Sequence, residues 1–189
     1  DLMKKHEMTE EDVKMRFITP AILKNGWDLQ QQIKAEYFFT DGKVIVRGNV
    51  VRRGERKRAD YLLHYKPNIP IAIVEAKDMT HSIGDGMQQA IDYALILDVP
   101  FAYSSNGVGF IEHDMKMGTE REITLDEFPS PEELWKRHCG YNSYTERVEK
   151  IITQPYYFSA NSKTPRYYQR IAINKTIEAV ANGQNRILL

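Results

Sequence analysis

The stretch from Ile71 to Lys77, IAIVEAK, decides how the rest of the chain is arranged. Its apolar beginning is typical of a buried strand, and its end places a carboxylate and an amine two residues apart. Because alternate residues of a strand share a face, Glu75 and Lys77 should point to the same side of the sheet. Burying charged groups costs free energy unless they have partners, so this strand end is a candidate functional site.

A hairpin should bring Asp60 to the same place. Pro67 and Asn68 form a turn signal between two strand-like segments. Asp60 lies seven positions before Pro67, and Glu75 lies seven positions after Asn68, so a hairpin centred on this turn pairs the two acids across neighbouring strands. A slip of one residue, caused by Pro70 or by a bulge, would send Asp60 to the opposite face.

The bulk composition excludes several classes of protein. The 26 basic and 26 acidic residues give a formal net charge of zero, whereas a domain that grips nucleic acid alone is usually basic. A partner or another domain should therefore supply much of any such grip. The single cysteine, Cys139, rules out an internal disulfide and fits a reducing cytoplasm. The start of the chain has no apolar signal-peptide core, and no apolar run approaches the ~20 residues that span a bilayer.

The periodicity of apolar residues predicts alternating helices and strands. A capping box at Thr9 and Asp12 should start the first helix, and Pro20 should break or kink it. Asp41-Gly42 and Asn106-Gly107 predict hairpins, and a helix between two strands predicts a parallel crossover. We expect helices at about 9–25, 83–97, 131–138, 145–152 and 167–181, and strands at 32–40, 43–47, 71–77, 99–104, 108–112 and 122–125.

A basic run precedes Asp60 in a segment, residues 49–58, that we expect to be an exposed excursion. Two interpretations stay open: a solvated loop, and a patch that faces the phosphates of a nucleic acid. The basic residues of the run are Arg52, Arg53, Arg56, Lys57 and Arg58.

Asp60, Glu75 and Lys77 supply the parts that phosphodiester hydrolysis needs. Two carboxylates can bind Mg²⁺, which prefers hard oxygen ligands and keeps some of its waters, and the Ala76 carbonyl is a further candidate ligand. Lys77 can orient the attacking water or stabilise the negative charge that develops in the transition state. From spacing alone, the alternative is a salt bridge at a sheet edge.

Other polar residues have both a functional and a structural interpretation. Glu36, on an early strand, is either an acid near the metal or an exposed strand residue, and Glu11 is a weaker candidate of the same kind. Gln89 and Tyr93 lie four residues apart on one helix and should meet, either at the site or simply in packing against the sheet. The five histidines lack metal-site spacing, and one cysteine excludes a thiolate zinc cluster.

Asp60, the apolar strand and Glu75-Ala76-Lys77 together resemble the PD-(D/E)xK nuclease motif, although Ala59 stands where that motif often has proline. More of the chain, roughly residues 9–140, is similar to the N-terminal nuclease domain of type I restriction enzyme R (motor) subunits. The segments that carry this resemblance are RADY at 58–61, AIVEAK at 72–77, QQAIDYA at 88–94, YSSNG at 103–107 and FPSPEELW at 128–135.

The resemblance implies an α/β fold with a restriction-endonuclease-like core, in which helices flank a mixed β-sheet. Gln89 and Tyr93 match the family's QxxxY motif, which is implied to support the site or to contact DNA. The tail from Thr164 resembles the segment that leads into a RecA-like motor domain, where Gln169 would read the adenine of ATP. No GxxxxGK[ST] phosphate loop follows within the sequence, so we expect no ATPase activity from this chain alone.

We therefore expect a nuclease domain at 1–152, a linker at 153–165 and the beginning of the first motor domain at 166–189. The implied activity is Mg²⁺-dependent (or Mn²⁺-dependent) cleavage of double-stranded DNA after ATP-driven translocation by the full-length protein. The implied partners are methyltransferase and specificity subunits. Two alternatives stay open: a non-cutting module for DNA binding or subunit docking, and a stand-alone nuclease of the same superfamily.

Overall fold

Six strands form one mixed sheet in the computed structural model of the chain. The structure describes residues 7–41, 45–47, 50–52, 54–155, 167–184 and 186. The order across the sheet is β1-β4-β5-β6-β7-β8, in which β5 and β6 run parallel and the other neighbours run antiparallel. The strands are β1 (Ile33–Thr40), β4 (Arg56–Lys66), β5 (Ile69–Ala76), β6 (Phe101–Ser105), β7 (Gly109–Asp114) and β8 (Glu120–Thr124). A separate ribbon pairs β2 (Ile45–Arg47) with β3 (Val50–Arg52).

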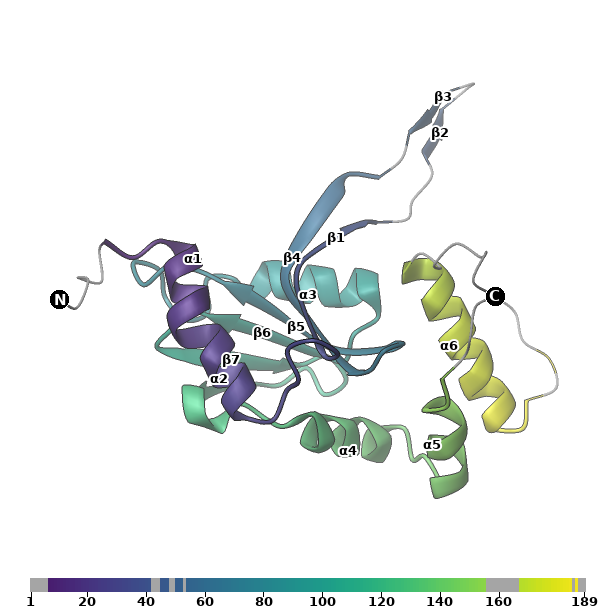
Figure 1. The fold of residues 1–189 in the computed structure, drawn as a ribbon. Helices are drawn as coiled ribbons and strands as arrows, with labels where there is room; N and C mark the ends of the chain where they lie inside the picture. The colour runs from purple at the N-terminus through teal and green to yellow at the C-terminus, as the bar shows by residue number, and fades with distance from the viewer. Residues whose placement is uncertain are drawn as a thin grey trace.

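Helices cover both faces of this sheet, as expected. Three consecutive segments, α1 (Glu10–Val13), η2 (Lys14–Ile18) and α2 (Thr19–Lys24), form one rod that is purple in Figure 1. The rod packs in one apolar cluster with one side of the sheet, whereas α3 (Met87–Leu97) packs in a second cluster with the other side. The remaining helices are η3 (Leu125–Glu127), α4 (Pro131–Tyr141), α5 (Glu146–Ile152) and α6 (Tyr167–Ala181).

The N-terminal rod begins as predicted but does not break at Pro20. The Asp12 N–H donates to Thr9 Oγ1 at 3.2 Å and the Thr9 N–H donates to Asp12 Oδ2 at 3.0 Å, which confirms the capping box. The segment Lys14–Ile18 is a π-helical turn, and the Thr19 N–H bonds to the Lys14 carbonyl five residues back. This wider turn accommodates the proline ring, which would otherwise clash with the preceding turn of an α-helix, so the helix continues.

The partner of β1 differs from the prediction. We expected residues 43–47 to return from a turn at Asp41-Gly42, but β1 pairs with β4, from Ile33 opposite Leu63 to Thr40 opposite Arg56. Residues 42–44 lie outside the described part of the chain, and 45–47 pair with β3 instead. A strand of 11 residues offers β1 a longer ladder than a short return could, and so overrides the local turn signal. The segment predicted as an excursion, residues 49–58, thus contains β3 and the start of β4, and the β2–β3 ribbon projects from the six-stranded sheet (Figure 1).

The crossover that carries the candidate site is confirmed, with a later helix start than predicted. Chain order runs from β5 through α3 to the parallel strand β6. The helix begins at Met87 rather than Ile83, because the glycine-rich residues before it form turns, one of them closed by a hydrogen bond from the Met87 N–H to the Gly84 carbonyl at 2.9 Å. At the other end, Asp98 closes the helix in a left-handed conformation with φ 54.

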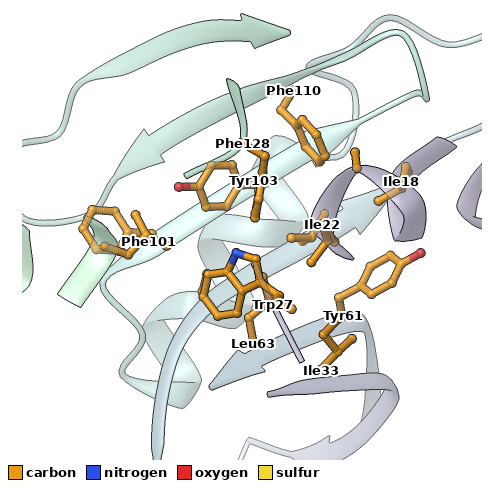
Figure 2. Packing of buried hydrophobic residues seen from close by; sticks show 14 of the residues in the cluster. Ile18, Ile22, Trp27, Ile33, Tyr61, Leu63, Phe101, Tyr103, Phe110 and Phe128 are labelled. Carbon is orange, nitrogen blue, oxygen red and sulfur yellow. The ribbon is translucent and has the colours of Figure 1, made fainter. Parts of the chain in front are cut away.

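Aromatic side chains fill the larger apolar cluster, between the N-terminal rod and the sheet (Figure 2). The Phe128 ring lies 4.8 Å from that of Tyr103 and 4.7 Å from that of Phe110, centroid to centroid. Trp27 donates its indole N–H to the Pro129 carbonyl at 2.9 Å, so its buried polar end is satisfied. Each large apolar side chain buried here contributes about 1.5–3 kcal/mol, which fixes the rod, and Lys14 with it, on the sheet.

A charged network ties β7 to β8 and α4. Glu112 on β7 is 2% exposed and accepts hydrogen bonds from the Tyr103 hydroxyl at 2.6 Å, Arg121 Nε at 2.8 Å and Arg137 Nη2 at 2.9 Å. Burial tends to raise the pKa of Glu112, but these donors outweigh burial and hold it below its ordinary value. The buried carboxylate is therefore fully compensated.

The C-terminal helices start where the sequence predicted. Ser130 and Thr145 cap α4 and α5 by accepting from the N–H groups of Glu133 and Val148. Helix α4 runs through Gly140 to Tyr141, three residues beyond its predicted end at about 138. Helix α6 lies against the body of the fold, where Asn174 Nδ2 donates to the Asn68 carbonyl at 2.8 Å. Most of the predicted linker and residues 187–189 lie outside the described residues.

None of the helices in the described part of the chain has the length and apolar character needed to cross a membrane.

His64 should make the stability of the fold sensitive to acid. It is 2% exposed on β4, and burial, reinforced by the charges of Lys34 and Arg170, lowers its pKa from 6.5 to about 3. Below pH 6.5 the unfolded chain binds a proton that the folded chain does not, so stability should fall by about 1.4 kcal/mol per pH unit down to about pH 3. In urea titrations from about pH 7 to 4, a His64→Gln variant should lack this component. A His81→Gln control should keep it, and curves for wild type and His64→Gln that stay parallel would contradict the assignment.

Candidate active site

Asp60, inside β4, and Glu75, near the end of β5, meet across the hairpin. The ladder pairs Leu62 with Ile73 and Tyr61 with Val74, so the next rung places Asp60 opposite Glu75, as the hairpin prediction required. Both side chains are buried, with 6% and 3% of their surface exposed. The Asp60 N–H donates to Glu75 Oε1 at 3.3 Å, and the Ala76 N–H donates to Asp60 Oδ2 at 2.9 Å. The two acids therefore form one unit fixed by backbone groups.

This register survives an irregularity near the turn. The pairing shifts between Leu63 and His64, opposite Pro70, and shifts back between His64 and Lys66. The two shifts compensate, so the rungs beyond them keep the spacing that the turn alone predicts. The slip considered from the sequence is therefore present locally but does not reach Asp60.

Positive charge near Glu75, from Lys77, only partly compensates the burial of this carboxyl beside Asp60. Burial, followed by the neighbouring Asp60 carboxyl, raises the pKa of Glu75 from 4.5 to about 10. A cation between the two acids would remove this penalty. The Ala76 N–H points toward Asp60, and the carbonyl of a strand residue points to the same side as its N–H, so this carbonyl can be a third oxygen donor.

This donor set fits a magnesium-type ion. Mg²⁺ needs only one or two carboxylates besides waters and substrate phosphates, and here Asp60 and Glu75 provide two. Within the described residues, no group of three or more His, Cys, Asp or Glu side chains is arranged to hold a metal. The arrangement is thus unlike a closed zinc site.

Lys77 lies one residue beyond β5, two positions after Glu75. Its N–H donates to the Ser105 carbonyl at 2.8 Å, which extends the ladder with β6 and fixes its backbone. The side chain is half-buried, and its positive charge partly offsets the rise in the pKa of Glu75 and of Glu10. The Lys77 amine therefore lies within electrostatic range of both Glu75 and Glu10.

Lys14 is a site residue that sequence reasoning missed. Its Nζ lies 3.2 Å from Asp60 Oδ1, 2.7 Å from Glu36 Oε1 and 2.5 Å from Glu11 Oε1. Burial tends to lower its pKa, but the three carboxylates outweigh burial and raise it, so Lys14 stays charged. The available signal was its position on the buried stripe with Ile18 and Ile22, four and eight residues on, where a lysine is unexpected.

Glu36 is brought to the site by an unusual backbone conformation. It has φ 52 and lies between the rungs that pair Ala35 with Tyr61 and Tyr37 with Ala59, so it faces Asp60 where that ladder is interrupted. Positive φ is uncommon for a residue with a side chain and costs about 1–3 kcal/mol, so it persists only where the surroundings enforce it. Of the two interpretations left open, the one that places Glu36 in the neighbourhood of Asp60 agrees with the structure.

Gln89 and Tyr93 form the predicted contact, but they pack rather than reach the acids. Gln89 Nε2 donates to the Tyr93 hydroxyl at 2.7 Å, and the Tyr93 ring meets that of Phe39 edge to face at 5.0 Å. Among the described hydrogen bonds and ion pairs, neither side chain contacts Asp60, Glu75 or Lys77. Helix α3 approaches the site at its N-cap, Gly86, instead. A Cβ there would lie 3.3 Å from that of Glu75, so the absence of a side chain lets the backbone come this close.

The basic run ends beside the site. Arg58 Nη1 lies 2.9 Å from Glu36 Oε2, Lys57 pairs loosely with Glu55 at 4.0 Å, and the exposed Arg56 lies over the Phe38 ring at 4.1 Å. Arg53 lies outside the described residues, and for Arg52 only its place in β3 is described. Gln169 is an exposed residue of α6, remote in sequence from this cluster.

Comparison with known proteins places the chain in a family. Residues 29–129 match the family model described as "Type I restriction enzyme R protein N terminus (HSDR_N)". Because this match covers more than half of the chain, the chain belongs to the family of type I restriction enzyme R protein N termini.

One curated protein and one solved structure support this membership. The chain is 53% identical over 186 residues to the "Type I restriction enzyme EcoAI endonuclease subunit" of Escherichia coli, covering 96% of this chain and 23% of that protein. It matches a fragment assigned to an HsdR subunit of a type I restriction enzyme from Vibrio vulnificus YJ016 with a TM-score of 0.82 and 43% identity. That match covers 96% of this chain and 34% of the other. The chain thus spans about a quarter of the length of the curated relative.

Proposed function

We propose that this chain is the metal-dependent nuclease region of a type I restriction enzyme R subunit and has a PD-(D/E)xK core. The observation that carries the proposal is the buried pair of Asp60 and Glu75, directly opposite each other, with Lys77 two positions beyond Glu75. The name of the E. coli relative, an endonuclease subunit, supports the same activity.

Asp60, Glu75 and the Ala76 carbonyl would hold Mg²⁺, or Mn²⁺ in its place. When bound, such an ion polarises the scissile phosphate and makes a bound water more acidic. Asp60 is held for this role by the Ala76 N–H, and Glu75 by the Asp60 N–H. Lys77, half-buried beside Glu75, would orient the attacking water or stabilise the charge that develops on the phosphate.

The substrate we propose is double-stranded DNA. Arg56 and its neighbours Lys57 and Arg58 on β4 lead directly to Asp60, so phosphates bound along this strand would reach the two acids. Arg52 and Arg53, before β4, would extend the same contact. Gln89 and Tyr93 would act indirectly, by fixing the start of α3 and with it the Gly86 backbone against Glu75.

The remaining functions belong to the full-length protein. We propose that cleavage there follows ATP-driven translocation in a cytoplasmic complex with methyltransferase and specificity subunits. The residues from 166 onward would begin the first motor domain, and Gln169 would contact the adenine of ATP. The zero net charge of this chain agrees with an arrangement in which other domains or the partner subunits provide most of the DNA binding.

Exchange of Lys77 for alanine tests the proposal. In the full-length protein assembled with its partner subunits, Lys77→Ala should reduce Mg²⁺-dependent nicking of plasmid DNA by about 10²-fold or more, with ATP hydrolysis unchanged. Lys136→Ala, which changes an exposed lysine of α4, is the matched control and should cut at the wild-type rate. Equal nicking by wild type and Lys77→Ala would instead support the non-cutting module.

A further inference from the structure

We propose that the Lys14 ammonium is a built-in cation that takes the place of a second metal ion, so that this site binds one divalent ion. The inference deepens the proposed function and rests on it. It concerns the side of Asp60 that faces away from Glu75, where the three carboxylates of Glu11, Glu36 and Asp60 converge on one amine.

The acids of the site form a row across three neighbouring strands. Glu36 on β1 faces Asp60 on β4, which in turn faces Glu75 on β5. Lys14 Nζ lies between the first two, at 2.7 Å from Glu36 and 3.2 Å from Asp60 Oδ1. The other oxygen of Asp60, Oδ2, is directed to the Ala76 N–H at 2.9 Å, on the Glu75 side. Asp60 therefore has one oxygen for Lys14 and one for the proposed metal.

This is the geometry by which a carboxylate bridges two cations. In two-metal phosphodiesterase sites the ions lie about 3.5–4 Å apart and share such a ligand. Here the position on the Glu36 side is already filled by a positive charge. A divalent ion placed there as well would be repelled by the ammonium and would find its carboxylate oxygens already paired.

Lys14 is fixed in this position rather than free to swing away. Its side chain is 7% exposed, whereas that of Glu11 is 70% exposed, so the amine is the buried member of the pair. Lys14 begins the π-helical turn, and Glu36 has a left-handed backbone conformation. Two uncommon backbone features thus converge on one ion pair, as expected where the position of a functional group is under constraint.

Counting bound Mn²⁺ tests the role of Lys14 independently of cleavage. Isothermal titration of this 189-residue chain, which contains its own core, should give one Mn²⁺ per wild-type chain. The number of bound ions calculated from free Mn²⁺, measured by electron paramagnetic resonance, should agree with the number from calorimetry. Lys14→Met keeps the apolar stem but removes the charge, and should bind two ions. Lys14→Arg retains a cation and should bind one. Lys24→Met, which alters an exposed lysine paired with Asp126 at 2.8 Å, is the matched control and should also bind one.

The possible results separate this inference from the proposed function. Two ions in the wild-type chain, a count that needs no variant to fold, would overturn the role of Lys14 alone. A Lys14→Met chain with a native circular dichroism spectrum that still binds one ion would do the same. No binding of Mn²⁺ by the wild type would overturn the proposed metal site itself. In a Lys14→Met/Glu36→Gln double variant, loss of the second ion would support the position assigned to it.

Discussion

Changing Glu75 to glutamine is expected to stabilise the metal-free chain and at the same time to abolish cleavage. Burial and the Asp60 carboxyl raise the pKa of Glu75 from 4.5 to about 10, so folding at neutral pH forces this carboxyl to take up a proton. The cost begins above pH 4.5 and grows as the pH rises toward 10, because the unfolded group is ionised there and the folded group is not. Glutamine avoids this cost, and we expect a gain of about 1–3 kcal/mol at pH 7.

Bound metal should reverse the order of stability of the wild-type chain and the Glu75→Gln variant. An ion that binds only the folded wild type stabilises it by mass action, whereas a neutral amide in place of Glu75 is a poor ligand for Mg²⁺. Urea unfolding should therefore show Glu75→Gln as the more stable chain in EDTA, and a response to Mn²⁺ in the wild type only. Cleavage by the full-length variant should fall by about 10²-fold or more.

A surface exchange on β8 provides the control for Glu75→Gln. Glu122→Gln changes an exposed acid and should alter neither stability nor cleavage by a measurable amount. The explanation fails if Glu75→Gln is less stable than the wild type in EDTA, because Glu75 would then be a structural ion-pair partner. A variant that gains stability when it loses activity usually marks a site that is maintained for activity rather than for stability.

Truncation of Glu112 to alanine is expected to have the largest effect on stability. Glu112 is 2% exposed and is the common acceptor for Tyr103, Arg121 and Arg137. Its removal leaves Arg137, a partly buried residue of α4, without its closest carboxylate. Breaking a buried ion pair on one side costs about 3–5 kcal/mol. Urea unfolding at pH 7 should show a loss of this size.

Two further variants serve as a surface control and as a test of whether the unpaired charge causes the loss of stability. Glu120→Ala on β8, where the side chain is about half exposed, should cost little. Adding Arg137→Met to Glu112→Leu should recover part of the loss, because both buried charges are then gone together. A double variant no more stable than Glu112→Leu alone would show that the unpaired guanidinium is not the cause of the loss.

Local signals were sufficient for most of the fold and for the core of the candidate site. The Pro67-Asn68 turn and simple counting placed Asp60 opposite Glu75, because the two strands are joined directly and little can intervene. The capping box at Thr9 marked the start of the first helix, because a cap depends on residues within one turn.

Long-range competition accounts for what the sequence did not predict. The turn signal at Asp41-Gly42 suggested that β1 pairs with the residues that follow it, but β4 offered a longer ladder. Lys14 reaches Asp60 across 46 positions, and no local pattern encodes such a contact. Its place on the apolar stripe was an available signal for a buried lysine, but that signal could not have identified its partners. The same applies to Glu36, whose strand was predicted but whose backbone conformation was not.

The compensating shifts in the β4–β5 hairpin limit how this region can diverge in evolution. One residue gained or lost between Asp60 and Glu75 would rotate one acid out of the pair, whereas two changes, one on each arm, would restore it. Selection should therefore tolerate exchanges of residue type along the hairpin while rejecting odd changes in its length. Insertions that survive should come in matched pairs or be absorbed in a bulge, as the irregularity opposite Pro70 already shows.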